Sequence, residues 1–193
     1  MSMETLEAIA TRRSNRRFKA DPIPQDVLEK ILSAGIMAPS GKNRQSWRFV
    51  VVREDKRSEM VAKMREGIAK FKARGENFGS AEGTAAVMEQ APVTVFIFNT
   101  DGKPPWLDHS IDERIWEIVC VQSVGAAIQN ICLAARALGL GSLWICDVFV
   151  AYEELAAWLG QDTQMVAAVS LGYPADNPVI FARKPLADVT IWR

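Results

Sequence analysis

The sequence predicts an α+β protein with one central sheet, built as a single domain over residues 1–193. Segments with helical periodicity alternate with short apolar runs typical of buried strands, but without the strict strand–helix–strand rhythm of a parallel sheet. A chain of 193 residues, 49% of them apolar, is long enough to enclose a substantial core. The sequence contains no internal repeat and no linker that would divide it.

The first half of the chain begins with two helices. Leu6 and Ile9 start a helical stripe that ends at a basic run, and Pro24 suits the first turn of a second helix. The buried face of that second helix is apolar: Val27, Leu28, Ile31, Leu32 and Gly35. A loop at 38–43, rich in turn-forming residues, leads into a fully buried strand at 47–52, and an amphipathic helix follows at 58–73.

The second half contains the longest element. Residues 75–83 are small and polar, which predicts a mobile loop or a broken helix. A strand at 93–98 and an irregular stretch at 99–111 lead to a helix over 112–138, which is apolar nearly all round and therefore expected to be central. Gly139 and Gly141 end it. The remaining expected elements are a strand at 143–145, a helix at 152–159 and a strand at 165–171.

Charge and hydropathy bear on the partners of the protein. The formal net charge is zero, so no overall basic field favours nucleic acid or an anionic membrane. The N-terminus lacks the apolar run of a signal peptide. The most apolar window, 115–138, is interrupted by polar residues, which favours a core helix over a membrane span. We expect a cytoplasmic protein that binds neither nucleic acid nor a membrane.

The cysteines and the single histidine argue against side-chain catalysis. Cys120, Cys132 and Cys146 are widely spaced in apolar surroundings, which favours buried free thiols over metal binding or a reactive thiol. His109 is the only histidine, so most metal sites and a Ser/His triad are disfavoured. We therefore expect no metal, and we expect a bound cofactor to carry the chemistry.

A basic cluster follows the first helix. Arg12, Arg13, Ser14, Arg16 and Arg17 place four guanidinium groups and a hydroxyl within six positions. Guanidinium groups are planar forked donors that match a phosphate. The spacing alone favours a phosphate site and a solvated basic turn equally.

A second candidate segment, residues 38–47, precedes the strand expected at 47–52. Gly41 allows the backbone to approach a ligand closely. Asn43 and Gln45 each offer a donor and an acceptor, which suits the edge of a heteroaromatic ring. An ordinary loop that leads into a strand explains the same composition.

Together these two segments resemble the FMN-dependent nitroreductase family. The resemblance rests on Arg-Arg-Ser-x-Arg-x-Phe near the N-terminus and on Ala-Pro-Ser-x-x-Asn-x-Gln-x-Trp before the strand. Three later pieces agree: Gly-Ala-Ala-Ile-Gln-Asn with the Leu-Gly-Leu-Gly turn after it, Leu-Gly-Tyr-Pro at 171–174, and Arg-Lys-Pro-Leu at 183–186. The family implies a mostly antiparallel sheet flanked by helices, and an intertwined homodimer with FMN at its interface.

The resemblance also implies a role for each matching residue. Arg12, Ser14 and Arg16 match positions that hold the FMN phosphate and ribityl chain, Arg13 adds contacts, and Arg183 matches a further phosphate ligand.

Two more segments match parts of the flavin site. The loop that reaches the flavin from the partner subunit is matched by Pro39, Ser40, Gly41, Asn43 and Gln45. The strand beside the reactive edge of the flavin is matched by Trp144, Ile145, Cys146 and Asp147. Many family members carry Pro-x-Glu-Gly at this last segment, so the chain departs from the pattern there. For Cys146 we favour a packing role over a redox role.

The family implies an NAD(P)H oxidoreductase that works in two steps. NADH or NADPH reduces the flavin at N5 and leaves, and a nitroaromatic, a quinone or a related small-molecule acceptor then takes its place. No side chain is required as a catalytic acid or base. A specialised member that deiodinates a substrate or fragments the flavin, and a non-catalytic flavin sensor, remain alternatives.

The choice of acceptor is expected to depend on residues 60–78 and 100–116, which vary most in the family. Candidates to line or cap the pocket are the aromatic and imidazole side chains there, with core or interface packing as the alternative: Phe71, Phe78, Trp106, His109 and Trp116. Trp106 is the leading candidate for a lid. Four cations could recognise the extra phosphate of NADPH, but we favour the alternative that they form the solvated face of a helix: Arg65, Lys70, Lys72 and Arg74.

Overall fold

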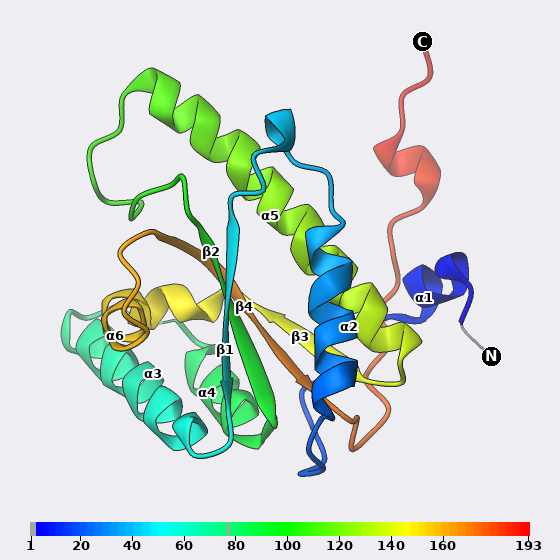
Figure 1. Ribbon diagram of the computed structural model, residues 1–193, viewed down its shortest axis with the longest axis horizontal. Helices are drawn as coiled ribbons and strands as arrows, with labels where there is room; N and C mark the ends of the chain where they lie inside the picture. The colour runs from blue at the N-terminus through cyan, green and yellow to red at the C-terminus, as the bar shows by residue number, and fades with distance from the viewer. Residues whose placement is uncertain (1–2, 77) are drawn as a thin grey trace.

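The computed structural model describes residues 3–76 and 78–193, and an antiparallel sheet lies at its centre (Figure 1). The strands are β1 (Trp47–Arg53), β2 (Val93–Asn99), β3 (Gly141–Ile145) and β4 (Gln164–Gly172). They lie in the order β1-β2-β4-β3, and each neighbouring pair is antiparallel. The prediction of an α+β fold with a mostly antiparallel central sheet is confirmed.

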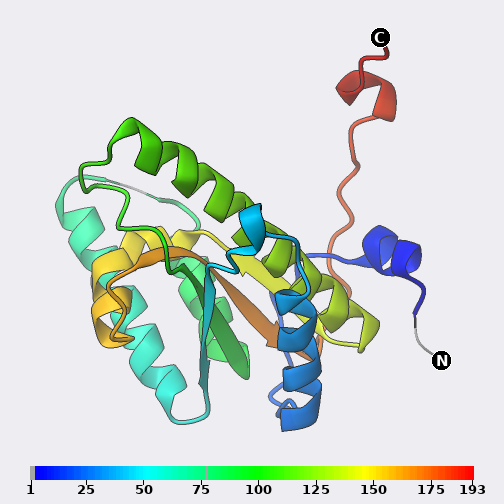
Figure 2. The same cartoon turned by 45° about the horizontal axis from the view of Figure 1, so that its top comes forward.

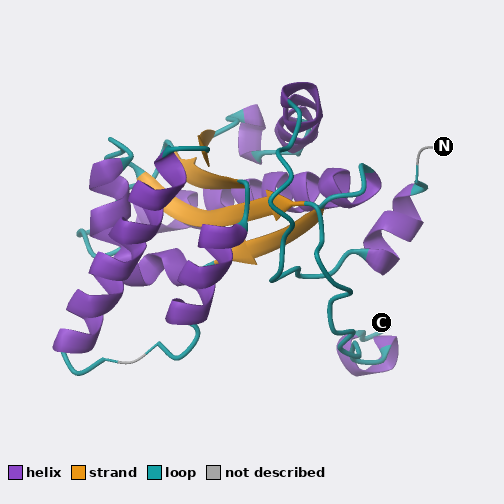
Figure 3. Cartoon of the chain, turned by 90° about the horizontal axis from the view of Figure 1, so that it is seen from below, coloured by secondary structure: helices purple, strands orange, loops and turns teal. Residues whose placement is uncertain are grey.

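Helices cover both faces of this sheet (Figure 3). Val95 and Ile97 of β2 belong to a core shared with α2 (Gln25–Ile36) and α5 (Ile111–Ala137). The alternate residues Phe96 and Phe98 belong to a second core, which contains side chains of three helices: α3 (Lys56–Ala73), α4 (Ala81–Gln90) and α6 (Tyr152–Trp158). Because successive side chains of a strand point to opposite faces, the wholly buried β2 serves both cores.

Two expectations from the sequence are wrong in this region. No helix was expected at 81–90, yet α4 forms there and buries Ala81, Ala85 and Met88. The strand at 47–52 was expected to be fully buried, but β1 lies at an edge of the sheet and only Val52 is fully buried in it. Residue 77, within the loop expected at 75–83, lies outside the described residues.

The long helix α5 is less central than its composition suggests. It crosses one face of the sheet, and its N-terminal half projects beyond the strands (Figures 1 and 2), with Ile111, Ile115 and Ile118 exposed. It ends at Ala137, and the φ of 80° at Gly139 is the left-handed conformation common just after helices. By length and composition alone α5 could cross a membrane; 44% of its most apolar window is buried, and core helices of soluble proteins meet the same criteria.

The last residues of the chain leave the body of the molecule near its N-terminal helix (Figures 1 and 2). Residues 175–193 leave the body after β4 and extend near α1 (Thr5–Thr11), which Figure 2 shows clearly. The exposed side chains of this C-terminal segment are largely apolar: Val179, Ile180, Phe181, Leu186, Val189, Ile191 and Trp192. Extended apolar surfaces of this kind commonly mark interaction sites.

Candidate functional site

The arginine cluster runs alongside β3. The backbone N–H of Asn15 donates to the carbonyl oxygen of Ser142 at 2.9 Å, and Ser14 pairs with Ser142 in a parallel bridge. A Cβ on Gly141 would lie 2.6 Å from Cγ of Asn15, so only glycine permits this approach. The segment is therefore fixed to the edge of the sheet.

The residues predicted to hold the phosphate surround one small cavity. It has a volume of 120 Å³ and is lined by residues from both ends of the chain: Arg12, Arg13, Ser14, Arg16, Val179, Phe181 and Arg183. Arg13 donates to the carbonyl oxygens of Ala10 and Arg12 at 2.7 and 2.8 Å. Over residues 3–76 and 78–193, Arg12, Arg16 and Arg183 have no side-chain hydrogen bond or ion pair. Three uncompensated guanidinium groups around a hollow suit a dianionic phosphate.

A larger cavity begins where the small one ends. It has a volume of 510 Å³ and lies between the arginine cluster, α4 and the end of β3: Arg16, Arg17, Ser80, Gly83, Thr84, Ala86, Val87, Gln90, Leu143, Trp144, Ile145, Cys146 and Asp147. Arg16 lines both cavities. The volume falls within the range of roughly 300–1,000 Å³ typical of cofactor sites.

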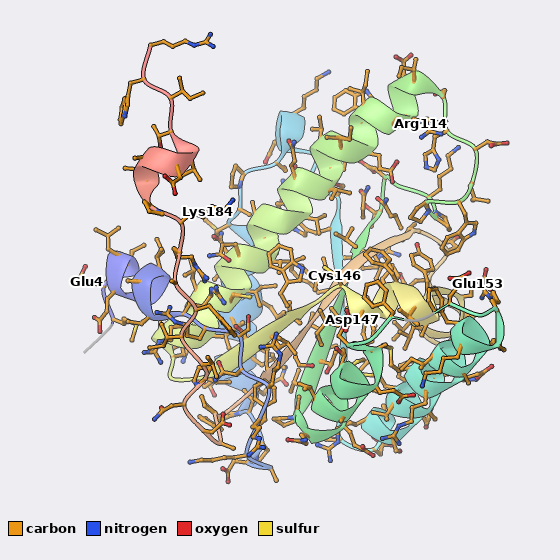
Figure 4. All side chains as sticks on the ribbon, turned by 180° about the vertical axis from the view of Figure 1, so that it is seen from behind. Glu4, Arg114, Cys146, Asp147, Glu153 and Lys184 are labelled. Carbon is orange, nitrogen blue, oxygen red and sulfur yellow. The ribbon has the colours of Figure 1, made fainter. Side chains whose placement is uncertain are left out.

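The end of β3 presents polar groups to this cavity. Figure 4 shows Cys146 and Asp147 there, near α4, and Lys184 on the C-terminal segment. The hydroxyl of Thr84 donates to Oδ2 of Asp147 at 2.5 Å, which ties the end of β3 to α4. The cavity therefore contains a carboxylate whose orientation is fixed.

The expectation that all three cysteines are buried is wrong for Cys146. Cys120 and Cys132 are buried, whereas Cys146 is exposed, because it follows the last residue of β3 and lines the larger cavity. Partial burial and the neighbouring charge of Asp147 raise the pKa of the Cys146 thiol. The thiol is therefore protonated at neutral pH and is a poor nucleophile.

The loop that contains Asn43 and Gln45 has a strained backbone. The φ angles of Lys42, Asn43 and Gln45 are 53°, 54° and 53°, in the left-handed region that side-chain-bearing residues seldom adopt. Such residues persist when their surroundings hold them, and they cluster at functional sites. The short 3₁₀ turn η1 (Gly41–Asn43) lies within this loop.

Contacts with α5 hold the strained loop in place. The backbone N–H of Gly41 donates to Oγ of Ser123 at 3.2 Å. A Cβ on Gly41 would lie 2.4 Å from Cγ1 of Val119, so the backbone rests directly on the helix. Nζ of Lys42 lies 4.7 Å from the ring centre of Trp116, which adds a cation–π contact.

This loop does not line the two cavities described above. Arg44 borders a third cavity of 260 Å³ at the start of α5, together with His109 and Trp116, and it pairs with Asp101 at 2.6 Å. In one chain, the residues Pro39, Ser40, Gly41, Asn43 and Gln45 are thus separate from the arginine cluster. Their contact with the flavin of a partner subunit stays a prediction.

His109 belongs to a polar network at the start of α5. Its side chain is 4% exposed, and its Nε2 lies 3.5 Å from Oε2 of Glu117. Glu117 also accepts a hydrogen bond from Gln164, which in turn accepts one from Nδ2 of Asn99 at 2.9 Å. These contacts link the segment before α5 to the ends of β2 and β4.

The other predicted pocket residues have mixed positions. Trp106 packs edge-on against Tyr152 with ring centres 4.5 Å apart, Phe71 packs against a core, and Phe78 is exposed. Of the four cations proposed for NADPH, three lie on α3 and form ion pairs there, as on a solvated helix face: Arg65 with Glu89, Lys70 with Glu66 and Glu154, and Lys72 with Glu82.

Sequence reasoning missed three residues that position the site. From the sequence, no role was assigned to Asn15, the uncharged residue between Ser14 and Arg16, which is buried. Thr84 lies on the helix that was not predicted, and Ser123 looked like one more small residue of a core helix. None of them has a spacing that reveals its contact.

Comparisons with known proteins show which family the chain resembles. A model of the nitroreductase family matches residues 9–173. A protein from Archaeoglobus fulgidus named NADH dehydrogenase/NAD(P)H nitroreductase is 33% identical over 179 residues, 90% of this chain and 87% of that protein. A 5,6-dimethylbenzimidazole synthase from Rhodobacter capsulatus is 30% identical over 189 residues, 90% of this chain and 86% of that enzyme.

A solved structure extends the likeness to three dimensions. The crystal structure of a nitroreductase from Desulfovibrio desulfuricans in complex with FMN has a TM-score of 0.75 and 29% identity, and the match covers 100% of this chain and 98% of that one. The family model, the relatives and the fold agree over most of the sequence, and the chain therefore belongs to the nitroreductase family of oxidoreductases.

Proposed function

We propose that this protein is an FMN-dependent NAD(P)H oxidoreductase that reduces nitroaromatics, quinones or related oxidised organic compounds. One observation carries the proposal: Arg16 lines both the small arginine-rich cavity and the larger cavity at the end of β3. A ligand with a phosphate at one end and a large ring at the other fits this arrangement. FMN has that form.

The residues present suit each part of FMN. Arg12, Arg16 and Arg183 offer unpaired guanidinium groups to the phosphate. The side chains of Leu143 and Ile145 form an apolar part of the wall of the larger cavity, and they would exclude water from a ring bound there. When bound, FMN supplies the capacity to accept a hydride from a nicotinamide and to pass electrons to a second substrate.

We further propose that the chain acts as a homodimer in which each FMN is completed by the 39–45 loop of the partner. Three observations support this: the loop is strained, it is separate from the arginine cluster of its own chain, and apolar side chains are exposed on α5 and the C-terminal segment. We also propose that residues 1–193 form one FMN-binding domain that works in the cytoplasm, where its free thiols persist.

Complementation between two defective chains tests the shared site. One chain carries Arg16→Ala and the other carries Asn43→Ala with Gln45→Ala, and both are expressed together with different tags. A mixed dimer then has one site with intact arginines and an intact partner loop, so it should regain about half of the normal FMN content, because one of its two sites is whole. If the loop served its own chain, both sites would stay defective and no activity would return.

Initial-rate kinetics test the proposed reaction. NADPH or NADH is varied at several fixed concentrations of a quinone or a nitroaromatic. Because both substrates use the same cavity in turn, parallel double-reciprocal lines are expected, together with a strict dependence on FMN. Activity that is unaffected by removal of FMN would contradict the proposal.

One relative favours a second candidate function. The 5,6-dimethylbenzimidazole synthase from Rhodobacter capsulatus is 30% identical over 90% of this chain. The benzimidazole in that name carries a dimethyl-substituted benzene ring, which fragmentation of a flavin would release. Chromatography of the products after aerobic incubation with reduced FMN distinguishes the two: formation of 5,6-dimethylbenzimidazole supports the second function, and unchanged FMN supports the first.

A further inference from the structure

Asp147 is the only carboxylate among the described residues that line the larger cavity. It follows Cys146 at the end of β3, within the segment where the sequence departs from the Pro-x-Glu-Gly of many family members. The proposed function places the ring of FMN in this cavity. The charge of Asp147 is therefore a feature of this chain at the place where the chemistry would occur.

The carboxylate is held in one orientation. Thr84, on α4, donates its hydroxyl proton to Oδ2 of Asp147 at 2.5 Å. The two residues come from different walls of the cavity, so the bond fixes the carboxylate relative to both. A charge that is held toward the site acts more strongly on a bound ring than one that can turn toward water.

The two arginines that line this cavity form no ion pair with the carboxylate. Arg16 also lines the small cavity, where it would face the phosphate. Arg17 also lines the larger cavity, but its guanidinium pairs with Asp176 at 3.7 Å, and Asp176 is not part of that lining. Neither guanidinium forms an ion pair with Asp147 among the described contacts. Among the residues that the structure describes, Asp147 thus has no ion-pair partner.

We propose that Asp147, oriented by Thr84 as a positioning residue, lowers the reduction potential of FMN in this cavity and so directs the enzyme toward acceptors that are hard to reduce, such as nitroaromatics. This inference rests on the proposed function. Reduction adds negative charge to the flavin, and a nearby carboxylate makes that addition less favourable. The oxidised form is then bound more tightly than the reduced form.

The test compares reduction potentials of the bound flavin, measured by equilibration with reference dyes. Asp147→Asn removes the charge with little change of shape, and we expect a more positive potential and several-fold tighter binding of reduced relative to oxidised FMN. Thr84→Val keeps the charge but frees the carboxylate, and we expect a smaller shift in the same direction. Asp162→Asn, an exposed change of equal charge outside the cavity, should leave the potential unchanged.

The outcomes separate this inference from the proposed function. If the wild-type protein binds no FMN, the proposed function fails. If it binds FMN that is reduced by NADPH or NADH, but Asp147→Asn and Asp162→Asn have the wild-type potential, only the role of Asp147 is overturned. Asp147→Glu is the control for a structural effect of substitution at this position, because it keeps the charge. Its flavin potential should stay close to that of the wild type, and a rise as large as that of Asp147→Asn would contradict the inference.

Discussion

Gly141 decides where the arginine cluster lies. Its missing side chain lets Asn15 approach β3, and the backbone bond from Asn15 to Ser142 then fixes the direction of the segment that contains Arg12 and Arg16. A residue with no functional group thus sets the geometry of the groups that we expect to bind phosphate.

We predict that Gly141→Ala weakens both stability and FMN binding. The new Cβ would lie 2.6 Å from Cγ of Asn15, and overpacking of this kind typically costs roughly 1–3 kcal/mol. Asn15 must move, and the arginines move with it. Denaturant unfolding and FMN fluorescence titration measure the two effects. Gly79→Ala, where a Cβ meets nothing within 4 Å, is the matched control; equal effects of the two substitutions would contradict the account.

Arg16 should contribute more to the binding of FMN than to the binding of riboflavin. A hydrogen bond to a charged group is worth roughly 1.5–3 kcal/mol, so Arg16→Gln should weaken FMN binding by about tenfold or more. Riboflavin lacks the phosphate and should bind both proteins almost equally. Fluorescence quenching measures both ligands, and Arg74→Gln, just after α3, serves as the control. An equal loss for FMN and riboflavin would show that Arg16 does not bind the phosphate.

The chemistry of single residues could be predicted from the sequence only in part. The run of arginines and the amide pair at Asn43 and Gln45 were recognisable from residue type and spacing. Thr84 was not, because its partner Asp147 is 63 positions away and the bond depends on the packing of α4 against β3. Local patterns carry no information on such contacts.

For the helices, the periodicity of the sequence predicted where a helix forms better than it predicted how deeply that helix is buried. The pattern predicted α5 within one residue at each end, yet its N-terminal half is exposed, because the sheet beneath it is shorter than the helix. Helix α4 was missed since its N-terminal glycine and polar residues are typical of loops, and packing against α3 overrides that preference. The apolar run of β1 is compatible with a central strand and with an edge strand, so it did not reveal that β1 lies at the edge of the sheet.

The start of α5 should show a pH-dependent contribution to stability. Ser110 and Glu113 form a capping box, and the ion pair with Lys103 and the backbone N–H of Ser110 lower the pKa of Glu113 to about 2 from 4.5. A carboxylate with a lowered pKa stabilises the fold above its unfolded value and loses that effect as the pH falls.

Glu113→Gln should therefore be less stable than the wild type at pH 7, and the difference should shrink as the pH falls from 4.5 toward 2. Urea unfolding across this range measures it. Glu76→Gln, at an exposed carboxylate between α3 and α4, controls for the loss of one charge. A difference that grows with acidity would contradict the assignment.

Large apolar side chains are exposed on two parts of the molecule. Ile115 and Ile118 on α5, and most of the C-terminal segment, face outward. The proposed homodimer explains both this surface and the separate position of the 39–45 loop. Composition and periodicity of the sequence do not predict a homodimer. The resemblance to a family supplied that expectation.

Ile118→Glu should weaken self-association. The side chain is 58% exposed in one chain, so the folded subunit tolerates the charge, but burial of an unpaired carboxylate in an interface is strongly unfavourable. Sedimentation equilibrium should show a shift from dimer toward monomer together with a loss of bound FMN. Gln161→Glu, a charge placed away from α5, should stay dimeric; an unchanged mass for Ile118→Glu would place the interface elsewhere.

The decisive measurement is an anaerobic spectral titration of the purified protein. We expect flavin absorbance in the isolated protein, bleaching by one equivalent of NADPH or NADH per FMN, and full return of the absorbance on addition of a quinone or a nitroaromatic. A protein that neither contains FMN nor binds added FMN would contradict the site itself. FMN that binds but stays oxidised with both nicotinamides would leave the fold and the site in place and contradict the proposed reaction.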